Sequence, residues 1–384
     1  MTDLVRRAAD LRPILARNRA IGDRLRRLPD ETVEALAGAG LFRALAPRRY
    51  GGGESDLRTA IDATSEVAKA DPAAAWTVMI LGSGAWITGL FPGAAQDEIY
   101  AAGPDVRVCT VLTPRSTARA VDGGWRLSGR WAPASGCLHS QWAMLGFPFL
   151  DGRSGVGLAL VPMRDLTVED TWFTLGMRAT GSNLLVGEDV FVPAHRVLEL
   201  GPAVRGERTG NRPDVPRYRA AMMPTLAAYL IAPCLGIAEA VLEHVVEQAG
   251  EKGISFTDYE RQSDSTAFQL AVADAAMKID VVRLIGHDSA AVVDGHAAAG
   301  THPDQLARAR IRLHTGHAAR LCREAVDGLV SASGASALAD SHPLQGYLRD
   351  IQVAVRHAVA SPASNGELFG RALLGVTPNI TEMI

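Results

Sequence analysis

The spacing of apolar residues changes twice along the chain, and this change limits the possible folds more than any other feature. Before residue 105, apolar side chains recur every three or four residues, as they do at Val33, Leu36, Ala37 and Leu41, which predicts amphipathic helices. Between Val106 and Pro193, short runs rich in Val, Leu and Trp alternate with turn signals, which predicts strands. After residue 216, the helical spacing returns in four long segments.

These changes predict an α+β protein in three domains. We expect an N-terminal helical domain over residues 1–104, a middle β domain over 105–200 and a C-terminal four-helix bundle over 217–384. The run from 201 to 216, which is rich in Gly and Pro, is expected to be a loop. The helix expected over Ala73–Phe91 is apolar nearly all round, so it should lie at the centre of the fold.

Composition and charge exclude several classes of function. The net charge is −3 and the sequence has no basic stripe, so we expect no nucleic-acid partner. The run Ala73–Phe91 lacks basic flanks and the N-terminus lacks an apolar signal core, so we expect no membrane span and a cytoplasmic location. Four distant cysteines and the isolated pair of His314 and His317 predict no metal site.

The stretch from residue 342 to 358 is typical of one late helix. Pro343 suits the first turn of a helix, where its missing N–H has no partner to lose. Arg349 and Asp350 lie in the middle of this helix, and His357 and Ala358 lie at its end. The apolar residues follow a spacing of three and four and predict one buried face; they are Leu344, Tyr347, Leu348, Ile351 and Val355.

Three stretches, in this order of domains, resemble the acyl-CoA dehydrogenase superfamily. The segment Leu175–Pro193, with Gly-Met-Arg-x-Thr near its start and Asp-Val-x-Val-Pro at its end, is similar to the family's segment that closes the β domain. Leu348-Arg349-Asp350 is similar to the family's late helix, and Ala273–Asp280 to a bundle helix that follows its flavin contacts. The resemblance implies a β-barrel-like middle domain, a homotetramer, and a flavin held between the β domain, the bundle and a neighbouring subunit.

One departure from the family concerns the catalytic base. In acyl-CoA dehydrogenases the late helix ends in Tyr-Glu-Gly-Thr, and its Glu removes a proton from the acyl thioester. Aligned from Arg349-Asp350, that position is Ala358 in this sequence. Because some members carry the base on an earlier bundle helix, Glu239 and Glu243 keep open the alternative of an acyl-CoA dehydrogenase that uses FAD with a displaced base.

A second departure concerns the tail of the cofactor. The Arg and Gln with which the dehydrogenases bind the tail of FAD align with Ser255 and Thr266, and their glycine motif aligns with residues 331–337. Arg261 and Gln269 are close enough in sequence to serve instead. Because an Arg supplies a fixed fork of donors to a diphosphate, these substitutions predict reduced FMN, or loosely held FADH2, rather than permanently bound FAD.

Four further features are similar to the monooxygenase branch of the same superfamily. They are Ser128–Cys137 with its Ser-Gly pair, Asp264–Gln269, the approach to the late helix at Ser336–Gln345, and His357 at its end. This branch holds the oxygenase components of two-component systems, such as the 4-hydroxyphenylacetate and steroid-phenol hydroxylases, the thiophene S-oxygenases and the amino-sugar N-oxygenases. The resemblance implies that a separate flavin reductase supplies reduced flavin, and that O2 forms a C4a-hydroperoxide that oxygenates an aromatic, polyketide-like or amine small molecule.

The resemblance to this branch also implies roles for particular residues. Ser135 aligns with the family's contact to flavin N5, so it is the candidate to bond N5 or the peroxide. His357 is the candidate to deprotonate the substrate or to donate to the peroxide, since the ordinary pKa of histidine lies near working pH. Contacts with the cofactor are expected from Ser135, Thr110, Leu112, Thr113 and Trp131, and contacts with the substrate from His139 and Arg178.

Other roles stay open at this point. Thr180, Ser182 and Asn183 in the closing segment are as well suited to turns as to ligand contacts. Residues 82–86 contain no histidine, although some members of the branch have one there. A catalytically silent scaffold with the same fold is a third possibility beside the monooxygenase and the dehydrogenase. Carbon, nitrogen and sulfur all remain candidate sites of oxygenation.

Overall fold

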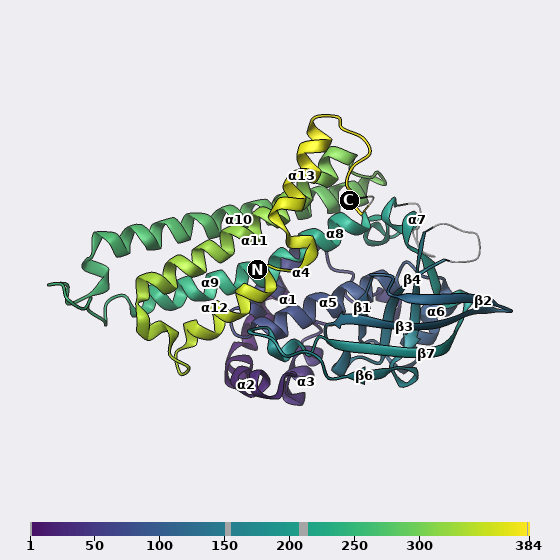
Figure 1. The fold of residues 1–384 in the computed structure, drawn as a ribbon, viewed down its shortest axis with the longest axis horizontal. Coiled ribbons are helices and arrows are strands. Elements are labelled where there is room, and N and C mark those ends of the chain that lie inside the picture. The colour runs from purple at the N-terminus through teal and green to yellow at the C-terminus, as the bar shows by residue number, and fades with distance from the viewer. Residues whose placement is uncertain (1, 150–154, 207–213, 382) are drawn as a thin grey trace.

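The computed structural model describes residues 2–149, 155–206, 214–381 and 383–384 of the chain. Figure 1 shows most helices of the N-terminal hundred residues in the middle and at the bottom, the strands on the right, and the long C-terminal helices extending to the left. The expected order of an N-terminal helical region, central sheets and C-terminal helices is therefore confirmed.

The N-terminal region is built of helices, and its most buried helix is α5 (Pro72–Thr88). Every residue of α5 except Ile80 is buried, as its apolar sequence predicts. Asp71 caps the helix, because its Oδ1 accepts hydrogen bonds from the backbone N–H groups of Ala73 and Ala74, both at 3.0 Å. The other helices of this region are α1 (Asp3–Asp10), α2 (Arg12–Leu25), α3 (Asp30–Gly38), α4 (Leu57–Ala68) and α6 (Gly93–Ile99).

The strands form two four-stranded sheets that share one core. One sheet has the order β1-β4-β5-β8, with β1 parallel to β4, and the other has the order β2-β3-β7-β6 with antiparallel pairs. Trp125 of β3 packs against Phe147 of β4 with ring centroids 5.4 Å apart, so aromatic side chains join the two sheets. The strands are β1 (Val108–Val111), β2 (Ser116–Val121), β3 (Gly124–Ala134), β4 (Trp142–Pro148), β5 (Val156–Pro162), β6 (Thr167–Glu169), β7 (Asn183–Pro193) and β8 (Val197–Glu199).

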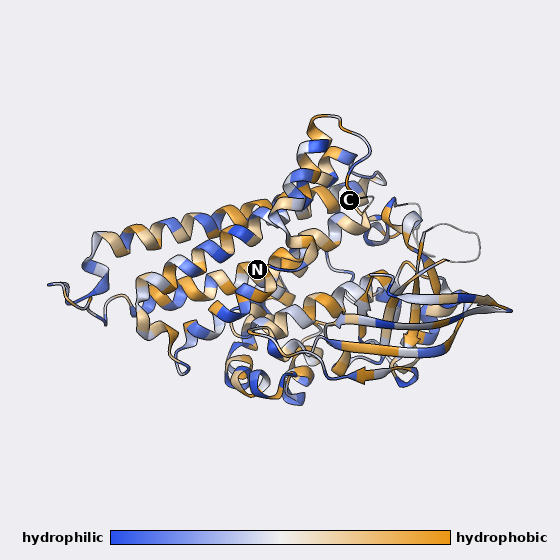
Figure 2. Ribbon diagram, viewed as in Figure 1, coloured by the Kyte–Doolittle hydropathy of each residue, from blue (hydrophilic) through white to orange (hydrophobic). Residues whose placement is uncertain are grey.

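The C-terminal region is built from long amphipathic helices, along which hydrophobic and hydrophilic residues alternate (Figure 2). Its helices are α8 (Met222–Tyr229), α9 (Ile231–Gln248), α10 (Thr266–Ala299), α11 (Gln305–Ser333), α12 (Pro343–Ala354) and α13 (Pro362–Leu373). In the part of the chain that the structure describes, one stretch is long and apolar enough to cross a membrane, namely α8 with α9. Its most apolar window is 89% buried inside the fold.

Three expectations about element ends were wrong. The late helix α12 ends at Ala354, so His357 lies beyond it in an extended conformation with φ −59° and ψ 139°. The helix expected over Ala73–Phe91 ends at Thr88. The loop expected over 201–216 begins with a short helix, α7 (Leu200–Val204), and its residues 207–213 lie outside the described residues.

A buried carboxylate fastens α12 to the segment that closes the β domain. Asp350 accepts a hydrogen bond from the backbone N–H of Met177 at 2.6 Å and another from Arg19 of α2 at 3.0 Å. Gly176 lies against α12 so closely that an added Cβ would stand 2.2 Å from the carbonyl oxygen of Arg349. The Gly-Met and Arg-Asp motifs therefore meet in space, and together they fix the closing segment relative to the end of α12.

Removal of this carboxylate should destabilise the fold strongly. We expect Asp350→Ala to lower the free energy of unfolding by about 3 kcal/mol, because the charge of Arg19 and the N–H of Met177 lose their buried partner. Urea unfolding followed by circular dichroism measures this change. Glu169→Ala is the control, since its ion pair with Arg130 is exposed and should contribute less than about 1 kcal/mol. An Asp350→Ala protein as stable as the control would contradict this role.

Candidate active site

Three elements that are distant in sequence meet around the indole of Trp76, near the start of α5. Its Nε1–H donates to the Oγ of Ser135, which directly follows β3, at 3.2 Å. Its ring packs edge-on against the imidazole of His357, which follows α12, with ring centroids 5.7 Å apart. Trp76 therefore connects the two side chains that the sequence predicts to be catalytic.

The Ser-Gly pair after β3 turns the chain toward the closing segment. Gly136 has a left-handed φ of 76°, which favours glycine, and an added Cβ would stand 3.1 Å from Leu81 of α5. The N–H of Gly136 donates to the carbonyl oxygen of Thr180 at 3.0 Å. This turn places the preceding Ser135 beside both α5 and the closing segment.

Ser135 begins a chain of buried hydroxyl groups. Its Oγ lies 2.7 Å from the Oγ of Ser182, which lies 2.7 Å from the Oγ1 of Thr180. Thr180 in turn donates to the carbonyl oxygen of Met177 at 2.8 Å. Asn183 differs, because its Oδ1 accepts bonds from the backbone N–H groups of residues 171 and 172 and so shapes a turn. Five residues form what is named here the Trp76 cluster: Trp76, Ser135, Thr180, Ser182 and His357.

The imidazole of His357 is neutral and is held in one tautomer. Its Nδ1 accepts a hydrogen bond from the backbone N–H of Val359 at 3.3 Å, so the proton of the neutral ring is on Nε2. Burial, together with the charge of Arg312, lowers the pKa of His357 to about 4. At neutral pH the ring therefore offers an Nε2–H donor and is a weak base. Of its two expected roles, the hydrogen-bond donor is favoured over the general base.

The structure places the other predicted cofactor contacts around β1 and β3. Thr110 of β1 lies against α5, Leu112 is half-buried against the core, and Thr113 is exposed. The indole of Trp131 is buried and donates to the carbonyl oxygen of Gly146 at 2.8 Å. That bond fastens β3 to β4, which is a structural role. The contacts of these four side chains with a cofactor stay predictions.

His139 and Arg178 are not members of the Trp76 cluster, and the buried Nε2 of His139 has no hydrogen-bond partner among the described residues. His139 is buried in the turn after β3, and burial with the positive charges of Arg27 and Arg107 lowers its pKa to about 4. Arg178 donates to the carbonyl oxygen of Asp23 on α2 at 3.1 Å. The positive charges that act on His139 lie just after α2 and before β1, and Arg178 contacts α2. Their place in a substrate pocket stays a prediction.

The two carboxylates considered as a displaced base are held by cations. Glu239 is buried on α9 and pairs with Arg283 at 2.7 Å and with Lys69 at 3.2 Å. Glu243, one turn later, pairs with Lys69 at 2.8 Å. These ion pairs occupy the carboxylate oxygens, so neither group is free to take a proton from a substrate. Ala358, which aligns with the base of the dehydrogenases, is exposed. These contacts argue against the dehydrogenase alternative.

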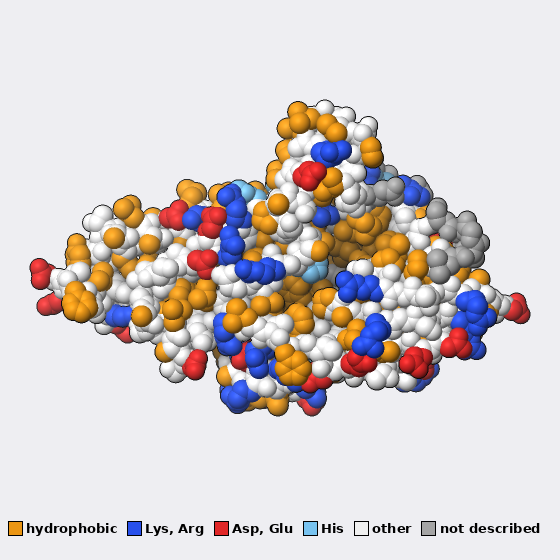
Figure 3. Space-filling view, in the orientation of Figure 1, with side chains coloured by type: hydrophobic (Ala, Val, Ile, Leu, Met, Phe, Trp, Pro, Cys, Tyr) orange, Lys and Arg blue, Asp and Glu red, His pale blue; other side chains and the backbone are white. Residues whose placement is uncertain are grey.

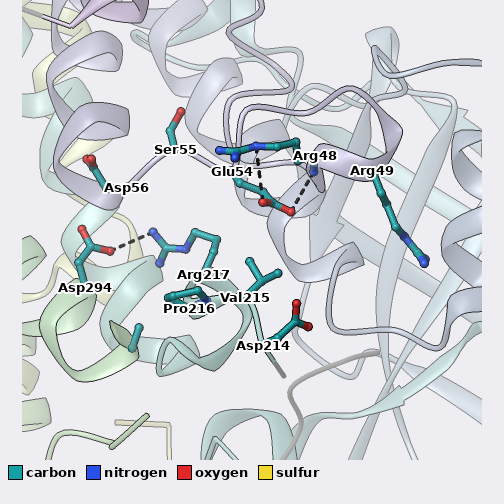
Figure 4. A pocket seen from close by; sticks show the side chains of 11 residues that line it. Arg48, Arg49, Glu54, Ser55, Asp56, Asp214, Val215, Pro216, Arg217 and Asp294 are labelled. Atoms are coloured by element: carbon teal, nitrogen blue, oxygen red, sulfur yellow. Dashed lines mark hydrogen bonds and ion pairs between the residues drawn. The ribbon is translucent and has the colours of Figure 1, made fainter. Parts of the chain in front are cut away.

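Two charged cavities lie apart from the Trp76 cluster. The first, of about 650 Å³, is shown in Figure 4, where Arg217 points toward Asp294. Arg217 is buried and reaches Asp294 at 3.2 Å, which joins the segment before α8 to α10. The second, of about 770 Å³, lies beside the Asp350 carboxylate and is lined in part by Arg19 and Arg178. No residue of the Trp76 cluster is among the described residues that line them.

The sequence analysis assigned no role to Trp76 and left those of Thr180 and Ser182 open. Trp76 belongs to a helix that is apolar on all sides, so periodicity treats it as core. One signal was available, since a buried indole N–H needs an acceptor. The hydroxyl chain had no such signal, because turn residues are commonly Ser and Thr.

Comparisons with known proteins show which family the chain belongs to. Family models described as the N-terminal and C-terminal domains of acyl-CoA dehydrogenase match residues 3–100 and 228–362. The oxygenase subunit HsaA of a flavin-dependent monooxygenase from Mycobacterium tuberculosis is 34% identical over 367 residues, which cover 93% of this chain and 91% of that protein. The oxygenase component of the FADH2-dependent resorcinol hydroxylase from a Rhizobium species is 29% identical over 391 residues, with 98% and 95% covered. The structure of XiaF from a Streptomyces species, in complex with FADH2 and glycerol, has a TM-score of 0.93 at 35% identity and covers 98% of this chain and 96% of that one.

The chain therefore belongs to the acyl-CoA dehydrogenase family, in its branch of flavin-dependent monooxygenases. Within that branch it is an oxidoreductase of the two-component type, and it is the oxygenase component. The identification agrees with the replacement of the dehydrogenase base by Ala358 and with the pairing of Glu239 and Glu243.

The residues of the Trp76 cluster fit the ring system of a flavin. Figure 3 shows a hollow with hydrophobic walls and a histidine at its edge, between the lobe that contains α13 and the β sheets. Apolar walls suit a flat ring system, and a few convergent polar groups orient it. Ser135 keeps one hydrogen-bonding position after its two hydrogen bonds within the cluster, so it can meet one polar atom of a ligand. His357 supplies one donor.

The lowered pKa of His357 predicts a pH-dependent stability. The unfolded chain binds this proton near the ordinary pKa of 6.5 and the folded chain near 4, so stability is lost as the pH falls between these values. Between pH 7 and pH 5 this loss amounts to about 2 kcal/mol. We expect His357→Gln to remove about that much of the pH dependence of the free energy of unfolding. Urea titrations of both proteins at the two pH values measure it, and parallel pH profiles would contradict it.

Proposed function

We propose that this oxygenase component hydroxylates a small aromatic molecule with O2 and a reduced flavin, FMN or FAD, that a separate flavin reductase delivers. The observation that carries the proposal is the Trp76 cluster, in which a serine hydroxyl and a neutral imidazole meet on one indole. Resorcinol, named for one relative, is a phenol, and this supports an aromatic substrate. Polyketide-like and amine small molecules are the alternatives that the test below includes.

The reduced flavin, when bound, supplies the electrons with which one atom of O2 passes to the substrate and the other leaves as water. The protein holds the reactants and keeps water out. Apolar side chains around a bound flavin would limit the access of bulk water, which protects the oxygen transfer from a loss as H2O2. Ser135 holds the flavin at N5, and the Nε2–H of His357 donates to an oxygen of the substrate or of O2.

The homotetramer implied by the family is also proposed, with α10 as a contact between subunits. Leu270, Met277 and Leu284 recur every seven residues on α10 and are 65–69% exposed. A heptad repeat of large apolar residues is the pattern by which helices pair. Exposed apolar surface of this kind commonly marks an interface between proteins. If α10 of a second copy of the chain packs here, it covers these exposed apolar side chains and pairs the two heptad repeats.

We also propose the division of the chain into domains and its cellular location. The division into domains at 1–104, 105–200 and 217–384 is supported by the separate family models that match 3–100 and 228–362. A cytoplasmic location is supported by the four cysteines, which are all free and buried, as expected of a protein made in a reducing compartment.

Heavy-oxygen labelling tests the proposed activity. With a flavin reductase, NADH and either FMN or FAD, the wild-type protein should incorporate one atom of labelled O2 into a phenol, found by mass spectrometry in a panel that includes amines and polyketide-like phenols. We expect His357→Ala to lower product formation roughly 100-fold and to release H2O2 instead, because the donor to oxygen is lost. Ser140→Ala is the control, since Ser140 bonds the carbonyl oxygen of Gly136 outside the cluster. Reduction of bound flavin by an acyl-CoA without O2, or an unaltered His357→Ala protein, would count against the proposal.

Size-exclusion chromatography with light scattering tests the assembly. Met277→Asp combined with Leu284→Asp should convert the homotetramer into smaller species, because charges would be buried in the contact between α10 helices. Arg164→Asp, on an exposed side chain of the β domain, is the control and should leave the mass unchanged. A wild-type monomer, or a double variant that is still tetrameric, would refute this contact.

A further inference from the structure

The chain of hydroxyls in the Trp76 cluster has a fixed direction. Each hydroxyl has a single proton, and two oxygens in hydrogen-bond contact need one proton between them. At one end, the Oγ1 of Thr180 lies 2.8 Å from the carbonyl oxygen of Met177, which has no proton, so Thr180 donates. At the other end, the indole N–H of Trp76 meets Ser135 at 3.2 Å and can only donate.

These two ends determine every bond between them. Because the proton of Thr180 points to Met177, the proton in the 2.7 Å contact between Thr180 and Ser182 belongs to Ser182. The proton in the 2.7 Å contact between Ser182 and Ser135 therefore belongs to Ser135. Ser135 thus donates to Ser182 and accepts from Trp76. Its one remaining lone pair is all that it can offer to a ligand, so toward a ligand Ser135 is an acceptor only.

Burial keeps the direction from reversing. Ser135, Ser182 and Thr180 are only 7%, 3% and 2% exposed, so bulk water does not exchange freely with them. Reversal would leave two oxygens, those of Thr180 and Met177, facing each other without a proton. Two facing lone pairs at this distance in a buried site repel each other, which is costly although the Met177 carbonyl also accepts from the indole of Trp172.

We propose that this directed chain makes the site select the reduced form of the flavin, with Ser182 and Thr180 as positioning residues. The inference rests on the proposed function, in which Ser135 faces flavin N5. Reduced flavin has an N–H at N5, which the lone pair of Ser135 accepts. Oxidised flavin has only a lone pair at N5, which faces the lone pair of Ser135 and is repelled. Oxidised flavin would lack this hydrogen bond to Ser135 and would therefore bind more weakly than reduced flavin.

Dissociation constants for the two redox states test the proposal without any turnover. FMN is titrated into the wild-type protein as the oxidised form in air and as the photoreduced form without O2, and protein or flavin fluorescence gives each Kd. The wild type should bind reduced FMN at least about tenfold more tightly than oxidised FMN, because one hydrogen bond distinguishes the two. In Ser182→Ala the proton of Ser135 is free to turn toward N5, so the preference should fall by about tenfold.

Two more variants separate the direction of the chain from its mere presence. Thr180→Val lets Ser182 donate to Ser135, which frees the proton of Ser135, so the preference should fall in the same way. Trp76→Phe removes the donor to Ser135 but leaves its proton directed to Ser182, so the preference should persist. Ser140→Ala, outside the chain, serves as the control. Thermal melting confirms that each variant is folded.

The outcomes distinguish this inference from the proposed function. If Ser182→Ala and Thr180→Val bind reduced FMN tightly and with the same redox preference as the wild type, the directed chain is wrong. The proposed function then stands. A wild-type protein that binds neither form of FMN nor of FAD overturns both. A preference that falls in these two variants and persists in Trp76→Phe supports the inference.

Discussion

The two hydrogen bonds that Asp350 accepts hold together both halves of the site. One comes from Arg19 and the other from the backbone N–H of Met177. The carbonyl oxygen of the same Met177 receives the proton of Thr180 and so ends the hydroxyl chain. His357 lies seven residues after Asp350 in the sequence. One buried carboxylate thus positions the acceptor end of the chain and the imidazole that packs on Trp76.

Arg19 extends this constraint to the helix that carries Trp76. Although burial disfavours its charge, Asp350, Tyr347 and Asp71 raise the pKa of Arg19, and the ring of Tyr347 lies 3.7 Å from its guanidinium. Asp71 is the cap of α5, and burial raises its pKa to about 6. The cap of α5 and the carboxylate of α12 are therefore stabilised by one cation. This shared charge holds the start of α5 close to α12.

The sequence predicts the order of the elements well because periodicity reports which face of each element is buried. It also marks Ser135 and His357, since both lie beside motifs that keep a fixed spacing. Trp76 could not be found in this way, because its bond to Ser135 joins residues 59 positions apart and depends on how two elements pack. Trp131 shows the converse. Its place in a motif suggests a cofactor contact, whereas its buried N–H fastens two strands together.

The polarity of the site is set by backbone groups rather than by the acidity of its side chains. The N–H of Val359 assigns the proton of His357 to Nε2, and the carbonyl of Met177 assigns the proton of Ser135 to its neighbour. A ligand bound as proposed would meet one donor and one acceptor whose roles do not change with small changes in pH, since the pKa of His357 is about 4. A dehydrogenase needs a strong base at this place, and Ala358 offers none. A site that donates to oxygen and removes few protons is suited to holding O2-derived oxygen until a substrate accepts it.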